Sequence, residues 1–505
     1  MRRKVQIVFA VGLILVAHAW GNLAWAQNSM WHTATVSAEG YRSDFELLEA
    51  TLKATHGGLT KYTSAEELQA LADALKTADH DITLHLAYAK LAQYIDAIRD
   101  GHTWIMPAEV QAHEILSQAF LPFTVKVQGF DVCIDQNYSD CHDLKPGTVL
   151  TAIDGRPVRN IVRELLPYFT ADGHSLSGKL GGLESQFWWY YGLHFGFHKT
   201  HEVAFKRVDG FADVRTVAAL RMNDRINDLN EIYTRYNDHD APVAWSIHGE
   251  AALLQVHSFS SMSLNQYRKQ FSSAMAAFKA AGCNFMVIDV RGNGGGREGV
   301  ENLLLACLGQ SCEEKYDAVE ICAPYAPHYR HFKQGFKRRT EDWIYTAVEF
   351  RRNASQKWER RDRFKRSFDG IDQPFTGPVS ILIDRNTFSG ASEFAALVRD
   401  NVPMSILIGE ETCGGYQGHT SGYAYELVLP NTGFIIHIPR IWFDLNVPGS
   451  DTGGVRPHVN ITSEGHAGEV DHVLNFALTG GWVQTLHDAT PQTTSQSMQH
   501  ETLKP

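Results

Sequence analysis

The sequence lacks the cysteine and histidine spacings that mark a zinc site: it has no Cys-x-x-Cys pair and no His-Glu-x-x-His helix among its 24 histidines. Beyond the N-terminus it has no run of 18 uninterrupted apolar residues, the length that a membrane-spanning helix needs. Positive charge is not in excess, since the formal net charge is -11, and this disfavours a nucleic-acid partner. We therefore expect no metal or other cofactor, no nucleic-acid partner and no integral membrane segment in the mature chain.

The N-terminus has the pattern of a secretory signal peptide over residues 1–26. Arg2, Arg3 and Lys4 form its charged part, residues 5–19 are apolar, and a small-x-small site places cleavage at Ala26/Gln27. The alternative is an uncleaved anchor helix, but the apolar part is short for a bilayer span. We expect a periplasmic or secreted protein.

Seven cysteines suit a compartment in which disulfides persist. Cys133 and Cys141 are candidates for one local bridge, and a second bridge is expected within the cluster Cys307, Cys312 and Cys322. The odd count leaves at least one thiol unpaired, and spacing alone does not give the pairing.

Residues 36–107 are predicted to be helical. Ser43 with Glu46, and Ser64 with Glu67, have capping-box spacing and precede apolar residues at helical period. A third helix is expected to stop at Gly101, a natural helix terminator. It would hold the next residue, His102, just past the end of a packed helix.

The remaining pattern predicts an α/β multidomain fold, because 505 residues exceed one ordinary core. Alternating apolar residues and turns predict a β-rich module over residues 118–220. Strands alternating with helices predict an α/β unit over residues 245–480. Residues 485–505 are rich in Thr, Gln and Ser, which is typical of a disordered tail.

A serine in the α/β unit is placed as nucleophiles often are. The buried strand 379–383 leads through the turn 387–393 into a helix, and Ser389 lies in that turn. The helix N-terminus offers free N–H groups and a positive dipole end to a developing oxyanion. The competing interpretation is that Ser389 or Ser392 merely caps the helix, with Glu393 as a first-turn acid.

Two further features match a serine nucleophile. His102 is a candidate base, although a histidine can also simply interact with a helix C-terminus. The loop at residues 291–296 follows a buried strand and is rich in glycine, without the Gly-Lys-Ser/Thr ending of a phosphate-binding loop. Glycine backbone approaches a reacting carbonyl closely and points N–H groups at it.

A basic, aromatic-containing segment spans residues 329–366. It is interpreted either as a solvated helical face or as a lid that guides substrate.

Three motifs in this order resemble those of the S41 serine peptidases, that is, the tail-specific or C-terminal processing peptidases and their tricorn-like relatives. They are the strand and loop 287–295, the turn Thr387-x-Ser389-x-x-Ser392-Glu393, and Ile408-Gly409-Glu410-x-Thr412-x-Gly414. The resemblance implies an α/β core of the ClpP/crotonase-like kind over residues 245–480. Residues 144–158 resemble the end of a PDZ-like module, which would bind an extended peptide.

One departure from the family concerns the base. Peptidases of the Ser-Lys type carry a lysine in a Gly-Lys-Gly turn, where this sequence has Gly414-Gly415-Tyr416. The tricorn-like branch resembles a serine–histidine arrangement instead, and His102 fits it.

The resemblance thus implies a secreted or periplasmic serine peptidase that acts on peptides or unfolded proteins. Ser389 would attack the carbonyl with His102 as base, and N–H groups of Gly390 and of Gly294 or Gly295 would bind the oxyanion. The group that orients His102 stays open; the candidates are Asp100, Glu410 and Glu411.

The alternative function is a catalytically inactive S41-fold protein that binds a peptide or lipid. An esterase is a third interpretation, but Ser389 does not lie in a Gly-x-Ser-x-Gly elbow.

Overall fold

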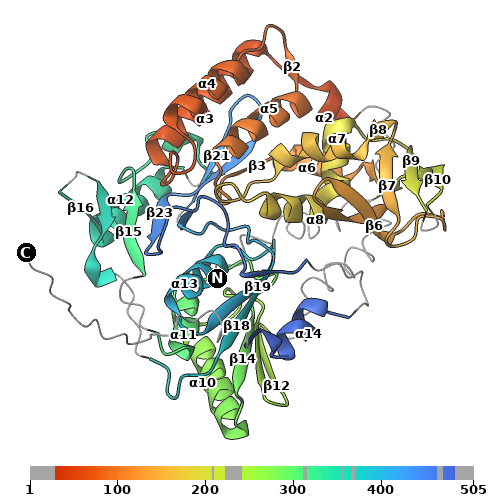
Figure 1. Cartoon of the computed structure of the whole chain (residues 1–505). Coiled ribbons are helices and arrows are strands. Elements are labelled where there is room, and N and C mark those ends of the chain that lie inside the picture. Colours follow the sequence, from red (N-terminus) through yellow and green to blue (C-terminus); the bar gives the residue numbers. More distant parts are fainter. Residues whose placement is uncertain are drawn as a thin grey trace, which may run out of the picture.

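The computed structural model describes residues 29–207, 210–221, 241–310, 315–333, 335–354, 357–364, 370–422, 424–462 and 470–483. The expected signal peptide, the expected tail 485–505 and Cys312 lie outside these residues. Figure 1 shows the N-terminal half, in red to yellow, stacked on an α/β part in green and blue. No helix in the described ranges is long and apolar enough to cross a bilayer.

The N-terminal region is mainly helical, as its periodicity predicts. Ser64 and Glu67 form the expected capping box, whereas Ser43 lies inside a helix that is capped by Ser37. The Ser37 side chain accepts the Gly40 N–H, so the cap lies at Ser37 and not at Ser43, and the helix starts earlier than expected. The elements are α2 (Met30–Thr33), β1 (Thr35–Val36), α3 (Ala38–Thr55), α4 (Ala65–Leu75), β2 (Ile82–Thr83), α5 (Leu84–Ala97), β3 (Trp104–Met106) and α6 (Glu109–Leu116).

The next module is β-rich and holds a sheet in the order β10-β9-β7-β6-β5, with β8 paired to β7. Strands β9 and β10 pair antiparallel and form a hairpin. The aromatic cluster 187–191 lies on α8 and is largely buried, so it packs in the core. The elements are β4 (Ala119–Phe120), β5 (Phe123–Gln128), β6 (Asp131–Asn137), β7 (Val149–Ile153), β8 (Arg156–Pro157), α7 (Val158–Leu165), η2 (Leu166–Tyr168), α8 (Leu176–Phe195), β9 (Thr200–Lys206), β10 (Ala212–Ala218) and β11 (Leu220–Arg221).

The α/β part is built on a sheet in the order β12-β13-β14-β18-β19-β24, parallel except for the edge strand β12. Apolar residues of α10, α11 and α13 cover one face, and α14 covers the other. Because both faces of the sheet are covered, every residue of β18 and β19 is buried, and both strands are mainly apolar. The elements are β12 (Val243–His248), β13 (Ala251–Val256), α10 (Leu264–Ala281), β14 (Phe285–Asp289), α11 (Val300–Cys307), β18 (Val379–Ile383), α13 (Gly390–Asn401), β19 (Ser405–Gly409), β24 (Val459–Asn460) and α14 (His472–Leu478).

Two smaller sheets join the parts. One has the order β16-β17-β15-β23-β20, and the other is β21-β22-β3. In the second, β3 from the N-terminal region pairs with β22, so that Trp104 lies opposite His437. This pairing attaches the segment that carries His102 to the α/β part. The elements are β15 (Tyr316–Ile321), η3 (Tyr329–His331), α12 (Gly335–Glu349), β16 (Phe350–Arg352), β17 (Trp358–Arg360), η4 (Asp362–Phe364), β20 (Gly418–Ser421), β21 (Tyr425–Val428), β22 (Ile435–Ile438) and β23 (Ile441–Leu445).

Neither of the two expected cysteine bridges is formed among the described cysteines. Cys133 and Cys141 are both free thiols, and so are Cys307 and Cys322. Cys133 is on β6, where its thiol donates to the Lys126 carbonyl at 3.8 Å.

Candidate active site

Ser389 lies in the turn between β18 and α13, at the position before the first residue of the helix. Its backbone has φ 53° and ψ -128°, and its side chain makes no capping hydrogen bond. A non-glycine residue in this region of φ/ψ space costs about 1–3 kcal/mol, so surrounding structure must hold it. Ser392 donates instead to the Thr387 carbonyl at 2.9 Å. Ser389 is therefore not a side-chain cap.

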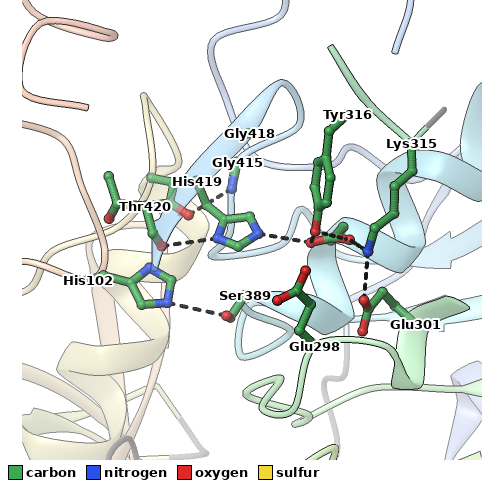
Figure 2. A network of polar contacts seen from close by, with 12 residues as sticks. His102, Glu298, Glu301, Lys315, Tyr316, Ser389, Gly415, Gly418, His419 and Thr420 are labelled. Atoms are coloured by element: carbon green, nitrogen blue, oxygen red, sulfur yellow. Dashed lines mark hydrogen bonds and ion pairs between the residues drawn. The ribbon is translucent and has the colours of Figure 1, made fainter. Parts of the chain in front are cut away.

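His102 faces this serine, with its Nε2 3.2 Å from the Ser389 Oγ, as Figure 2 shows. The two residues are 287 positions apart in the chain. The His437 ring lies on β22 and donates from Nδ1 to the His102 carbonyl at 2.8 Å. The pairing of β3 with β22 thus fixes the histidine next to the serine.

The segment before His102 differs from the expectation in one respect. The residue with positive φ at the end of α5 is Arg99, at 61°, and not Gly101. Gly101 has a packing role, because a Cβ there would lie 2.6 Å from the Phe388 ring. The same Phe388 ring stacks on the His102 imidazole with centroids 4.4 Å apart. Gly101 therefore permits the loop to approach the turn that carries the serine.

The glycine loop also contacts the serine turn. A Cβ on Gly295 would lie 2.6 Å from the Gly390 nitrogen and 2.8 Å from the Ser389 Cβ. The Gly295 N–H donates to the Asn293 side chain at 2.8 Å, which removes it as an oxyanion donor. A Cβ on Gly294, in contrast, would have nothing within 4 Å. Gly390 is the first residue of α13, where an N–H has no partner within the helix.

Two of the three carboxylates expected near His102 make their contacts elsewhere. Glu410 forms an ion pair with Arg385, and Glu411 accepts the Gly454 N–H at 3.0 Å. The ring of His102 contacts neither of them among the described hydrogen bonds and ion pairs. Both residues follow β19, and their side chains stabilise the turn after that strand instead of reaching the histidine.

Asp100 does lie beside His102, together with a carboxylate that the sequence pattern missed, Asp172. One ligand-type atom from each of the three side chains lies within 4.8 Å of the other two. Asp172 is fully buried and accepts the backbone N–H groups of Gly101 at 2.8 Å and Gly415 at 3.1 Å. No motif surrounds Asp172, and only its contact with the two turns identifies it.

Asp100 is held by hydrogen bonds from other side chains. His56 Nε2 lies 3.0 Å from it, and the hydroxyls of Thr103 and Thr420 both donate to it. Burial raises the pKa of Asp100, but its hydrogen bonds with His56 and Thr103, together with its electrostatic interactions with the His56 and His102 rings, outweigh burial and hold the pKa well below its usual range. Asp100 is therefore a carboxylate.

Burial lowers the pKa of His102 to about 3, although the Asp100 charge acts in the opposite direction. The imidazole is therefore neutral near pH 7 and can accept a proton from the serine. Its Nδ1 is buried and has no hydrogen-bond partner in the described part of the chain. Burial, followed by the Asp100 charge, raises the pKa of Asp172 to about 7.

A second polar network lies next to the histidine, and Figure 2 shows it. The His419 ring stacks against His102 with centroids 5.6 Å apart. Its Nδ1 lies 3.0 Å from the Thr420 carbonyl and its Nε2 lies 3.2 Å from Glu393. Because both partners only accept hydrogen bonds, both nitrogens carry protons and His419 is an imidazolium.

This network extends to the helix that follows the glycine loop. Lys315 Nζ lies 2.7 Å from Glu393 and 2.8 Å from Glu301 on α11. The Tyr316 hydroxyl donates to Glu393 at 2.9 Å. Burial raises the pKa of Glu393, but the Lys315 charge and the His419 hydrogen bond lower it to about 2. The positive charges of Lys315 and His419 thus balance the negative charges of Glu393 and Glu301 next to the site.

The group of Asp100, His102 and Asp172 has the donor types of a metal site. Its carboxylate oxygens already accept hydrogen bonds from side chains or backbone N–H groups. The two carboxylates are therefore better suited to orienting His102 and stabilising its charge than to binding a cation.

Comparisons with known proteins concern the family and the fold. Residues 250–461 match the family model described as Peptidase family S41. No curated protein matches the chain significantly.

Among solved structures, mature CPAF complexed with lactacystin aligns with a TM-score of 0.58 and 13% identity, over 89% of this chain and 97% of that chain. A CPAF mutant aligns with a TM-score of 0.56 and 13% identity, over 89% and 96% of the two chains. The photosystem II D1 C-terminal processing protease aligns at 0.39 and 14% identity, over 84% of this chain and 94% of that chain. The two CPAF structures show that the fold extends over most of the chain.

Proposed function

We propose that this chain is a serine-type peptidase that cleaves peptide bonds with Ser389 as nucleophile and His102 as general base, since its residues 250–461 match the model of Peptidase family S41. The contact of 3.2 Å between Ser389 Oγ and His102 Nε2 is the observation that carries the proposal. Chain segments 287 residues apart supply the two groups, and the fold holds the serine in a strained backbone conformation. A strained residue of this kind is typical of a functional site.

In the proposed reaction, His102 takes the hydroxyl proton as Ser389 Oγ forms a bond to the peptide carbonyl carbon. The tetrahedral intermediate then collapses, and His102 gives the proton to the leaving amine. Water attacks the acyl-enzyme in the same way and releases the second product. The N–H groups of Gly390 and Gly294 bind the oxyanion, and each such donor is worth about 3 kcal/mol.

Asp100 and Asp172 are proposed to position His102 and to stabilise its positive charge during the reaction. Asp172 joins the loop before His102 to the turn at Gly415, and Asp100 is a buried carboxylate. Both act through His102 and touch no reacting atom. We propose that the negative charge of the two carboxylates acts on the Nδ1 of His102, which has no hydrogen-bond partner among the described residues.

We propose unfolded proteins or peptides as substrates and the periplasm or the exterior of the cell as the compartment. The N-terminal pattern of residues 1–26 supports this location. The PDZ-like pattern at residues 144–158 supports the binding of an extended peptide beside the catalytic part.

Labelling with a fluorophosphonate probe tests the mechanism without knowledge of the substrate. We expect the mature wild type to be labelled, and Ser389→Ala and His102→Ala to lose labelling while their thermal unfolding remains cooperative. Labelling lost only in the serine variant would contradict His102 as the base. A folded wild type that is not labelled would favour the inactive peptide- or lipid-binding alternative.

A further inference from the structure

The helix α12 presents an apolar face to solvent. Its residues at helical period include four large apolar side chains that are between 45% and 65% exposed: Phe336, Trp343, Ile344 and Val348. These positions are separated by seven, one and four residues, which places them on one side of the helix. Contiguous exposed apolar surface of this kind marks an interaction site more often than scattered residues do.

The inner face of α12 carries polar residues, alongside Tyr345, which packs against the Phe350 ring. Asp342 and Thr346 are buried, and Arg440 reaches both, at 3.5 Å from Asp342 and 2.7 Å from the Thr346 hydroxyl. Thr346 also donates to the Pro324 carbonyl at 3.1 Å. The helix is thus fixed to the protein by polar contacts, which leaves its apolar residues available for a partner.

The segment that carries this apolar face is rich in basic residues. Residues 329–366 hold thirteen Lys and Arg against five Asp and Glu, although the whole chain has a net charge of -11. Arg361 and Arg363 donate to carbonyls at the C-terminal end of α12, and Lys337 extends from the helix with an 85% exposed side chain. The chain therefore concentrates positive charge in the segment that carries this exposed apolar face.

We propose that the outer face of α12 docks on an anionic lipid membrane surface. Aromatic and aliphatic side chains would enter the boundary between headgroups and acyl chains, and the surrounding Lys and Arg would contact anionic headgroups. A two-fold contact between copies of α12 would bring two basic segments together, so charge complementarity disfavours self-association. The proposal is independent of the catalytic mechanism, because α12 contributes no residue to it.

Vesicle co-sedimentation of the mature chain tests the proposal with vesicles of phosphatidylglycerol and phosphatidylcholine, and with phosphatidylcholine alone. We expect binding only to the anionic vesicles, with an affinity that falls as salt rises. Trp343→Ser should weaken this binding about tenfold or more, since an aromatic anchor is lost from the interface. Phe211→Ser is the matched control, because Phe211 is 72% exposed just before β10, and it should bind as the wild type does.

Each variant should keep its fluorophosphonate labelling and unfolding temperature, so a change in vesicle binding reports on the surface alone. Absence of binding to anionic vesicles, or equal binding by Trp343→Ser and Phe211→Ser, would overturn the proposal. Concentration-dependent dimerisation that Trp343→Ser abolishes, without vesicle binding, would assign the face to a second copy of the chain and overturn it also.

Discussion

Substitution of Gly295 by alanine tests whether the glycine loop fixes the position of the nucleophile. The new Cβ would lie 2.6 Å from the Gly390 nitrogen and 2.8 Å from both the Phe388 carbonyl and the Ser389 Cβ. Real Cβ contacts are longer, and two of these neighbours are backbone atoms, so the serine turn itself must shift. The φ of 78° adds strain, since only glycine adopts this conformation without cost.

The backbone strain and the displacement of the serine each have an expected magnitude. A side chain at positive φ costs about 1–3 kcal/mol of stability. A displacement of the nucleophile approaching 1 Å reduces the rate about 100-fold. We therefore expect Gly295→Ala to be labelled by the fluorophosphonate about 100 times more slowly than the wild type while it still unfolds cooperatively.

Gly292→Ala is the matched control. Gly292 lies in the same loop at a φ of 68°, but a Cβ there would meet nothing within 4 Å. It should lose similar stability and keep labelling within a few-fold of the wild type. Equal labelling rates for Gly295→Ala and Gly292→Ala would refute the role of Gly295, because backbone strain is common to both.

Three further predictions concern charges. The pKa of His102 is lowered to about 3, so the acidic limb of the pH–rate profile should lie below pH 6.5. The His419→Gln substitution removes a nearby positive charge. It should therefore raise the pKa of His102 and move the acidic limb to higher pH. An unmoved limb would show that the His419 charge does not act on His102. Lys315→Met should cost about 3–5 kcal/mol in chemical denaturation because it leaves the buried Glu301 without its cation and removes one of the two cations beside Glu393. The exposed pair of Lys357 should cost less than about 1 kcal/mol when broken in the same way. Similar losses for both would contradict the buried network. Glu410→Gln should leave the labelling rate within a few-fold of the wild type, since that carboxylate pairs with Arg385; a loss comparable to that of His102→Ala would contradict this.

Local pattern predicted the elements that carry the site. Strand β18 covers the same residues, 379–383, as its apolar run, and the helix expected after Ser389 is α13. The capping box at Ser64 is confirmed, because it depends on residues three positions apart. The one at Ser43 is wrong, because Ser37 offers an equivalent cap and allows Phe45 to be buried in a longer helix.

Charged side chains were predicted less well than backbone elements. Glu410 and Glu411 lie in a motif after the nucleophile, but their partners are Arg385 and the Gly454 N–H. Asp172 has no motif and lies in contact with both turns of the site. Which carboxylate lies beside His102 depends on how separate modules pack together. The spacing of residues in the sequence does not give the distances between those modules.

The sequence by itself determined the strand–turn–helix that holds Ser389, the glycine loop and the helix that ends before His102. These features depend on apolar period, capping and glycine, all of which act over a few residues. Only the tertiary structure decided which histidine meets the serine, which carboxylates surround it, and that His419 is charged. The first two outcomes depend on the pairing of β3 with β22 and on buried contacts between residues more than 200 positions apart, where packing of whole modules sets the geometry. The charge of His419 depends on its burial between the Thr420 carbonyl and Glu393.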